Sequence, residues 1–270
     1  LENPAWTAGE NGEPEKRIAL DGAELFVRTE RFRSPDIVWI FSRGSFKRSQ
    51  KETVRPILIG DPTMFAVLSR KNIHLGLGAI VSGSIAGSYI GLDDGSEVVG
   101  SVISRTAIDI GSRPLETNLF DSAASPPEVP DIDIHAISKN WKRKLKETVL
   151  SGTTLNGGYH IRSGDLTIRD AIETGVSIWV EGSLRLEGAN ELRADPSWDT
   201  PVLVVEKDLT GTLSGAKLRG VIYVLGKVAL KGQGLVTGSI IADDINLSAG
   251  VVVQSFDGIA NEPRPPANFW

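Results

Sequence analysis

Residues 220–232 read GVIYVLGKVALKG, two short apolar runs separated by one glycine and closed by a second. The same phrase recurs with other letters at residues 178–188, IWVEGSLRLEG, and at residues 240–247, IIADDINL. A shorter copy, LVVEKDL, occupies residues 203–209. Each copy is a three-residue β-prone run, a polar or glycine corner, and an apolar–x–apolar pair. The stretch is therefore one unit of a repeat.

The spacing of the repeat predicts its architecture. The first residues of successive β-runs, Ile178, Leu203, Ile222 and Ile240, are 25, 19 and 18 residues apart, and a similar pair in the first half is 17 residues apart. A period near 18–20 residues with insertions indicates a solenoid in which each repeat is one coil. The frame of leucine-rich repeats and the 3.6-residue stripes of helical repeats are both absent from the sequence. We expect a mainly β protein built on a parallel β-helix.

The alternation within the repeat predicts the direction of each side chain, because successive residues of a strand point to opposite faces. We expect inward aliphatic ladders, with Arg185, Ala229 and Asn246 pointing outward between their members. The inward residues of these ladders are Leu184, Leu186, Val228, Leu230, Ile245 and Leu247. On the other side of the coils the outward positions are apolar, and they form a candidate surface for a partner or ligand: Trp179, Val204, Tyr223 and Ile241.

Composition along the chain predicts five regions. Residues 1–61 contain longer strands and are expected to form an antiparallel β-meander, residues 62–111 the first coils, and residues 159–258 the main coils. Residues 112–158 are a linker with an amphipathic helix at about 134–150, and residues 259–270 are a proline-rich tail. In the helix, Ile134, Ile137, Trp141, Leu145 and Val149 share one face, which we expect to dock on the outward apolar stripe.

Composition also limits the partners and metals. A net charge of -5 gives no reason to expect a nucleic-acid partner, and zero cysteines exclude disulfides and thiolate metal sites. Three scattered histidines, His74, His135 and His160, do not suggest a metal site, and no cofactor is expected. Residues 75–92 carry no charge, but eight of them are glycine or serine, so we expect coils there and not a membrane helix.

No catalytic motif is evident, and the protein is not expected to be an enzyme. The sequence contains no nucleophile elbow, P-loop, zinc-protease motif or calcium loop. Asp93-Asp94 and Asp243-Asp244 are the only aspartate doublets, and both are expected at coil corners, where aspartate forms turns. No catalytic or metal-binding residue is therefore assigned.

The quoted phrases resemble a known family. GGYHIRSGDLTI (157–168), SIWVEGSLRLEG (177–188) and GVIYVLGKVALKGQGLVTGSIIADDINLS (220–248) are similar to the C-terminal β-coils of type IV pilus accessory or minor pilin-like proteins of the PilX type. ELFVRTERFRSPDIVWIFSRGSF (24–46) resembles the meander that follows the long pilin helix, and LENPAW (1–6) resembles the end of that helix. The family's hydrophobic N-terminal helix is missing from this sequence. The resemblance carries no catalytic residues.

The resemblance implies a non-enzymatic component of a pilus or related cell-surface filament that displays its β-helix for assembly or adhesion. Its partners would be other pilin subunits, bound through the missing helix, and possible further ligands are surface polysaccharides. Its location would be the periplasmic or extracellular face of the bacterial cell envelope, anchored in the membrane or associated with the pilus. Two alternatives remain: a β-helix that binds or cleaves polysaccharide, and a self-polymerising β-helix scaffold.

Overall fold

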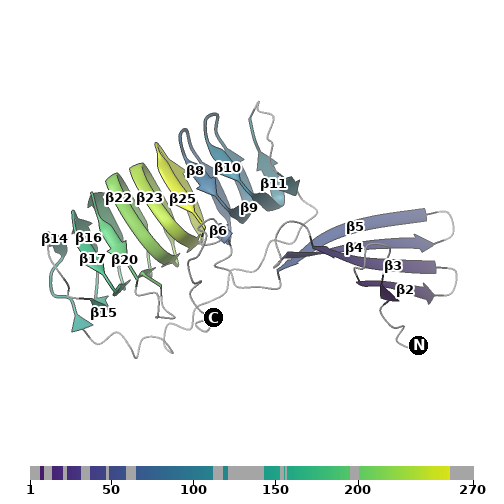
Figure 1. The fold of residues 1–270 in the computed structure, drawn as a ribbon, viewed down its shortest axis with the longest axis horizontal. Helices are drawn as coiled ribbons and strands as arrows, with labels where there is room; N and C mark the ends of the chain where they lie inside the picture. The colour runs from purple at the N-terminus through teal and green to yellow at the C-terminus, as the bar shows by residue number, and fades with distance from the viewer. Residues whose placement is uncertain are drawn as a thin grey trace.

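The computed structural model contains two β-sheet structures, which follow one another along the chain (Figure 1). It describes residues 7–8, 14–20, 23–31, 37–46, 49–58, 65–111, 118–120, 143–152, 155, 157–194 and 201–255. The first structure is an antiparallel sheet, and the second is the predicted parallel β-solenoid. The described residues contain no helix.

The N-terminal sheet is a meander in which each strand pairs with the next, as the sequence predicts. Long strands with β-branched and aromatic residues favour this arrangement. The register between the central strands runs from Ala23 opposite Phe46 to Arg31 opposite Val38. The strands are β1 (Thr7–Ala8), β2 (Pro14–Leu20), β3 (Ala23–Arg31), β4 (Ile37–Phe46) and β5 (Ser49–Leu58).

The solenoid consists of two blocks of coils. The strands of the first block are β6 (Phe65–Ser69), β7 (Asn72–Leu75), β8 (Ile80–Ser82), β9 (Ser84–Leu92), β10 (Glu97–Val99), β11 (Ser101–Asp109) and β12 (Asn118–Phe120). Those of the second block are β13 (Arg143–Lys144), β14 (Val149–Ser151), β15 (Gly158–Arg162), β16 (Leu166–Arg169), β17 (Ile172–Thr174), β18 (Val176–Val180), β19 (Leu184–Gly188), β20 (Glu191–Arg193), β21 (Leu203–Val205), β22 (Leu209–Val224), β23 (Lys227–Ala242), β24 (Asp244–Ser248) and β25 (Val251–Gln254).

Parallel pairing arranges these strands into three faces. Face A contains β13, β15, β18, β21, β6, β12, the last parts of β22 and β23, and the first parts of β9 and β11. Face B contains β14, β16, β19, β24, β7, the first parts of β22 and β23, and the last parts of β9 and β11. Face C contains β17, β20, β25, β8, β10 and the middle parts of β22 and β23.

The spatial order of the coils differs from their order in the sequence. The last coil of the second block pairs with the first coil of the first block, so that β23, β24 and β25 lie beside β6, β7 and β8. Figure 1 shows the yellow strand β25 next to the blue strand β8 for this reason. The two blocks form one continuous stack, and the chain enters that stack in its middle.

The interior is formed by the predicted aliphatic ladders. All six inward residues named from the sequence are at most 2% exposed, and Arg185, Ala229 and Asn246 between them are exposed. Val228 pairs with Leu209 on one side and with Ile245 on the other, so like side chains stack along the coils. The predicted register is confirmed. The uncharged stretch 75–92 contributes to β7, β8 and β9 of the same core.

Glycine occupies the corner between face C and face A in most coils. Gly220 pairs with Gly238, and both have φ near 137°, as Gly83 has 141°. This backbone conformation is rarely adopted by residues with a side chain. A Cβ on Gly220 would also lie 2.9 Å from the Cβ of Val202. The recurring G-S-I and G-V-I phrases of the sequence are therefore the corner and the first residues of each face A strand.

The prediction of a helix at about 134–150 is wrong for residues 143–150, which the structure describes. From Arg143 onward the chain forms β13 and β14, which pair in parallel with β15 and β16, so the second block already includes residues before 159. The Leu145 amide donates to the Ile161 carbonyl at 2.8 Å, and Leu145 joins the aliphatic core. Coil stacking satisfies these backbone groups and overrides the helical spacing. Residues 134–142 and 259–270 lie outside the described residues.

A buried carboxylate lies in the coil that contacts the terminal coil of the second block. Glu173 occupies the face C position that is Leu192 in the next coil, and it is 2% exposed. It accepts a hydrogen bond from the Leu155 amide, in the segment that replaces a face C strand in the terminal coil. Burial raises the pKa of Glu173, and the Leu155 amide and nearby His160 oppose the shift.

The ladder can be tested by placing a charge on each side of it. In Val228→Asp, an unpaired carboxylate would enter the aliphatic core, and we expect a loss of about 3–5 kcal/mol in the free energy of unfolding. The neighbouring Ala229→Asp should change it by less than about 0.5 kcal/mol, because position 229 faces solvent. Urea denaturation followed by circular dichroism measures both, and equal losses would contradict the register.

Glu173→Gln should stabilise the protein at neutral pH. Because the folded-state pKa of Glu173 is raised, the folded protein favours the neutral carboxyl, and the wild type loses stability as the pH rises through that pKa. Glutamine does not ionise and can still accept from Leu155. We expect a melting temperature a few degrees higher at about pH 7, since about 1 kcal/mol corresponds to ~2–4 °C in chains of this size.

The advantage of Glu173→Gln should shrink as the pH approaches about 4, where the wild-type carboxyl is also neutral. Glu191→Gln, an exposed position in the next coil, is the matched control and should leave the melting curve unchanged at both pH values. A stabilisation of Glu173→Gln that did not vary with pH would contradict the role of ionisation.

Candidate functional site

The acidic and histidine side chains form no catalytic or metal-binding cluster among the described residues. Within the described ranges, no group of three or more potential metal ligands comes together. Asp243 forms ion pairs with Arg70 at 3.2 Å and Lys71 at 2.9 Å, and Asp93 lies 3.3 Å from His74 Nε2. As predicted, the two aspartate doublets lie at coil corners, where they connect neighbouring coils.

The structure brings the predicted partner surface together as one column on face A. Trp179, Val204, Tyr223 and Ile241 occupy matching positions in successive coils and are at most 7% exposed. The Trp179 Nε1–H donates to Glu206 Oε1 at 3.1 Å, and the Tyr223 hydroxyl accepts from Arg70 at 3.2 Å. The column is thus buried in this structure. Its use by a partner stays a prediction. The predicted cover, a helix from Ile134 to Val149, is wrong for residues 143–149, and residues 134–142 lie outside the described residues.

Face B presents a regular solvent-facing surface. Each coil contributes two outward side chains, one on each side of an inward residue. In three successive coils these six positions form what we call the face B array: Thr210, Thr212, Ala229, Lys231, Asn246 and Ser248. Five of the six are short and uncharged, and all but the half-buried Ser248 are exposed. Parallel pairing places neighbouring rows about 4.8 Å apart.

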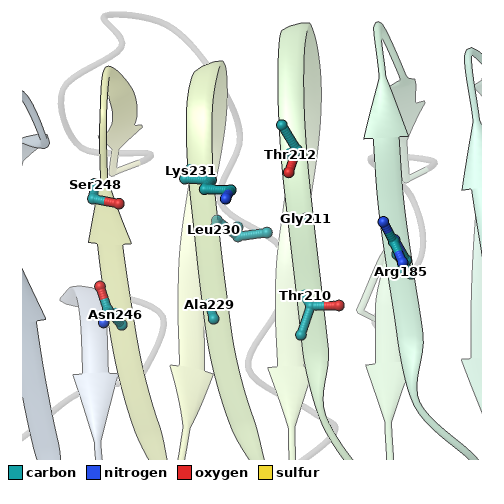
Figure 2. A pocket seen from close by; sticks show the side chains of 9 residues that line it. All are labelled: Arg185, Thr210, Gly211, Thr212, Ala229, Leu230, Lys231, Asn246 and Ser248. Carbon is teal, nitrogen blue, oxygen red and sulfur yellow. The ribbon is translucent and has the colours of Figure 1, made fainter.

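A glycine replaces a leucine in the inward ladder beneath the array. Gly211 stands where Leu186 and Leu230 stand in the coils on either side. A Cβ at Gly211 would lie 2.8 Å from Leu230 Cδ2, because the Leu230 side chain extends into that space (Figure 2). The outward side chains of the array border a depression of about 330 Å³, which is lined by the array together with Arg185, Gly211 and Leu230.

Charged groups next to the array are largely paired with one another. Glu187 accepts from Arg185 Nε at 2.6 Å and from Arg169 Nε at 2.9 Å. The hydrogen bond from Arg169 is the main cause that lowers the pKa of Glu187, so this carboxylate stays ionised between two guanidinium groups. On the other side of the array stand Gly91 and the paired His74. The array therefore lies between two regions whose charged or ionisable side chains contact partners of their own.

The arrangement favours binding and offers no evident means of bond cleavage. Hydroxyl groups, one amide, one methyl and one ammonium group point outward from a rigid sheet, and no acid–base pair stands in the depression. The sequence predicted a mostly polar side through Arg185, Ala229 and Asn246, but did not single it out as a site. The missed signal is T-G-T at 210–212, where the repeat requires an aliphatic residue in the middle.

Comparison with solved structures finds similar folds at low identity. The ice-binding protein 1 DUF3494 domain of Shewanella frigidimarina has a TM-score of 0.48 and 16% identity, over 73% of this chain and 95% of its own. The ice-binding protein of the Antarctic ascomycete Antarctomyces psychrotrophicus has a TM-score of 0.47 and 9% identity, over 72% and 95%. The competence-associated pilin ComZ of Thermus thermophilus has a TM-score of 0.41 and 10% identity, over 98% and 85%. No family model and no curated protein matches.

These findings correct the prediction that the chain is a PilX-type pilus component. Two of the three similar structures described above are ice-binding proteins, and the third is the pilin ComZ. Nothing found supports pilin subunits as partners, and the polysaccharide and self-polymerising alternatives gain no support either. The resemblance failed because its phrases, short aliphatic runs punctuated by glycine, are what the coils of a parallel solenoid require in general. Among the described residues no helix is long and apolar enough to span a membrane.

Proposed function

We propose that the protein is a non-enzymatic binding protein that adsorbs to ice through the face B array. We chose ice as the first ligand to test because solved structures with a similar fold include ice-binding proteins. The support for the proposal comes from the residues of face B alone. The observation that carries the proposal is the exposed set of short side chains repeated over three stacked coils at Thr210–Thr212, Ala229–Lys231 and Asn246–Ser248.

A crystalline surface requires a binder that repeats and holds its shape. The rows of the array are fixed by continuous backbone hydrogen bonding between β22, β23 and β24, with a close-packed aliphatic ladder directly beneath. Side chains such as threonine are stiff at χ1, so adsorption requires little loss of rotamer entropy. Ordered waters held between hydroxyl groups can then match the repeating oxygen positions of a lattice.

Electrostatics of the array fit the same ligand. A crystal of water carries no net charge, so a charged group gains no partner on binding and must lose part of its hydration shell. Lys231 is the one charged member of the array, while the nearby Arg185 and Glu187 already pair with each other. A polyanionic ligand would instead favour a face with several uncompensated cations, which the array does not provide.

The same site argues against an enzyme. Bond cleavage requires a positioned acid, base or nucleophile near a substrate. Within the described depression the ionisable groups are the cations Arg185 and Lys231, and Arg185 is held in an ion pair with Glu187 at 2.6 Å. The proposal also places the protein outside the cytoplasm, because it would act where ice crystals meet the cell surface or the surrounding medium.

Thr210→Tyr tests the array directly. The ring would stand above the plane of the array and separate its rows from a flat crystal, so we expect thermal hysteresis and partitioning into ice to fall to near the level of a buffer control. Thr237→Tyr, on face C of the same strand pair, is the matched control and should retain wild-type activity. If the wild type neither shapes ice crystals nor partitions into ice, the proposed function is wrong.

Lys231→Thr tests the electrostatic part of the proposal. Replacing the ammonium group by a short hydroxyl-bearing side chain removes the desolvation cost and extends the threonine pattern, so we expect thermal hysteresis to rise above the wild-type value. The position is exposed, and the melting temperature should change little. A fall in activity in a stably folded variant would mean that Lys231 contacts the ligand, which ice does not explain.

A further inference from the structure

At one junction of the described solenoid, the two coils that stack on each other are not consecutive in the sequence. This junction, called the seam here, lies between the last coil of the second block (238–254) and the first coil of the first block (65–82). Elsewhere in each block, coils that pair in the described stack also follow one another in the sequence. At the seam the partners are more than 170 residues apart in sequence.

The seam is stabilised by the same interactions as a continuous coil step. Ile240 pairs with Val67 on face A, Ile245 with Ile73 on face B, and Val253 with Val81 on face C. All six of these side chains are at most 2% exposed. The buried Ser239 hydroxyl donates to the Phe65 carbonyl at 2.6 Å. A complete coil surface is therefore buried on each side without any covalent continuity.

Charge complementarity marks the seam at the corner between faces A and B. Asp243 of the last coil accepts from Arg70 at 3.2 Å and from Lys71 at 2.9 Å. Asp244 accepts from the Asn72 amide group at 2.8 Å, and Ser69 donates to the Asp243 carbonyl at 2.6 Å. One side of the seam is acidic and the other basic, so each edge specifies the other as its partner.

We propose that the seam also forms between two copies of this chain, giving a dimer in which the first blocks are exchanged. Exchange of an identical element creates no new interface and loses none, so its free-energy difference from the monomer is small. Residues 121–142 connect the two blocks. These 22 residues can reach about 70 Å, whereas the nine or so coil steps that separate β12 from β13 in the stack measure only ~43 Å, so the connection is longer than one stack requires.

The order in which the two blocks are synthesised allows the exchanged dimer to form. The first block is synthesised before its partner coil at 238–254 exists, and its edge strands β6, β7 and β8 have unpaired backbone groups until then. Contacts between residues so distant in sequence form slowly. At high chain concentration, the finished last coil of a neighbouring molecule competes for the same edge, and the dimer persists because separation requires opening two seams.

Charge reversal in two full-length chains tests the exchange. In an Arg70→Asp chain or an Asp243→Arg chain alone, like charges meet at the seam, and we expect a lowered melting temperature. When the two are refolded together, an exchanged pair restores opposite charges at both seams. We expect a heterodimer by light scattering and native mass spectrometry, with a melting temperature above that of either variant alone.

Two controls separate exchange from other association. The double variant Arg70→Asp/Asp243→Arg should regain stability as a monomer at low protein concentration, because the reversed pair then lies within one chain. Arg169→Glu and Glu187→Arg reverse an ion pair between consecutive coils of one block, and mixing these two should yield no stabilised heterodimer. If the mixed seam variants stay separate, with unimproved melting temperatures, exchange does not occur. This result would leave ice binding untouched.

Discussion

The structure depends on parallel backbone pairing between coils, which fixes the direction of every side chain at once. A coil cannot satisfy its own N–H and C=O groups or bury its own aliphatic residues, so each coil is stable only between two others. Once one strand is in register, alternate residues point inward in the whole stack, and a shift by one residue would turn every ladder outward. Val228 and Ala229, adjacent in sequence and opposite in burial, show how sharply the register divides core from surface.

Polar groups are used where this pattern is interrupted. Asp165 and Asp208 stand at corners between faces A and B and accept from the amides of Ser183 and Lys227 in the next coil, each at 2.8 Å. Glu173 replaces an aliphatic residue where the terminal coil lacks a face C strand, and it accepts from the Leu155 amide there. In each case a side chain satisfies backbone donors that regular pairing does not reach, which explains acidic residues within a largely aliphatic repeat.

The repeat made the solenoid and its ladders predictable, because period-2 alternation and corner residues are local properties. The order of the coils was not predictable in this way. Nothing in the residues near Ile240 or Val67 indicates that these two pair, since any aliphatic β-run can stack on any other. The segment 143–150 was assigned to a helix because Leu145 and Val149 also suit a 3.6-residue period, and only the neighbouring coil decides between the two patterns. The face B array was overlooked because exposed threonine and serine are common on protein surfaces.

The seam and the face B array are neighbours but are structurally independent. Every residue of the array belongs to the second block, and its three rows are joined by β22, β23 and β24, while β24 also pairs across the seam with β7 of the first block. Whether the first block comes from the same chain or from another copy, the array keeps its rows and its underlying ladder. An exchanged dimer would therefore carry two complete arrays. Two arrays on one particle increase the residence time on a surface only when both can reach it together, so the relative orientation of the two stacks decides whether exchange changes binding.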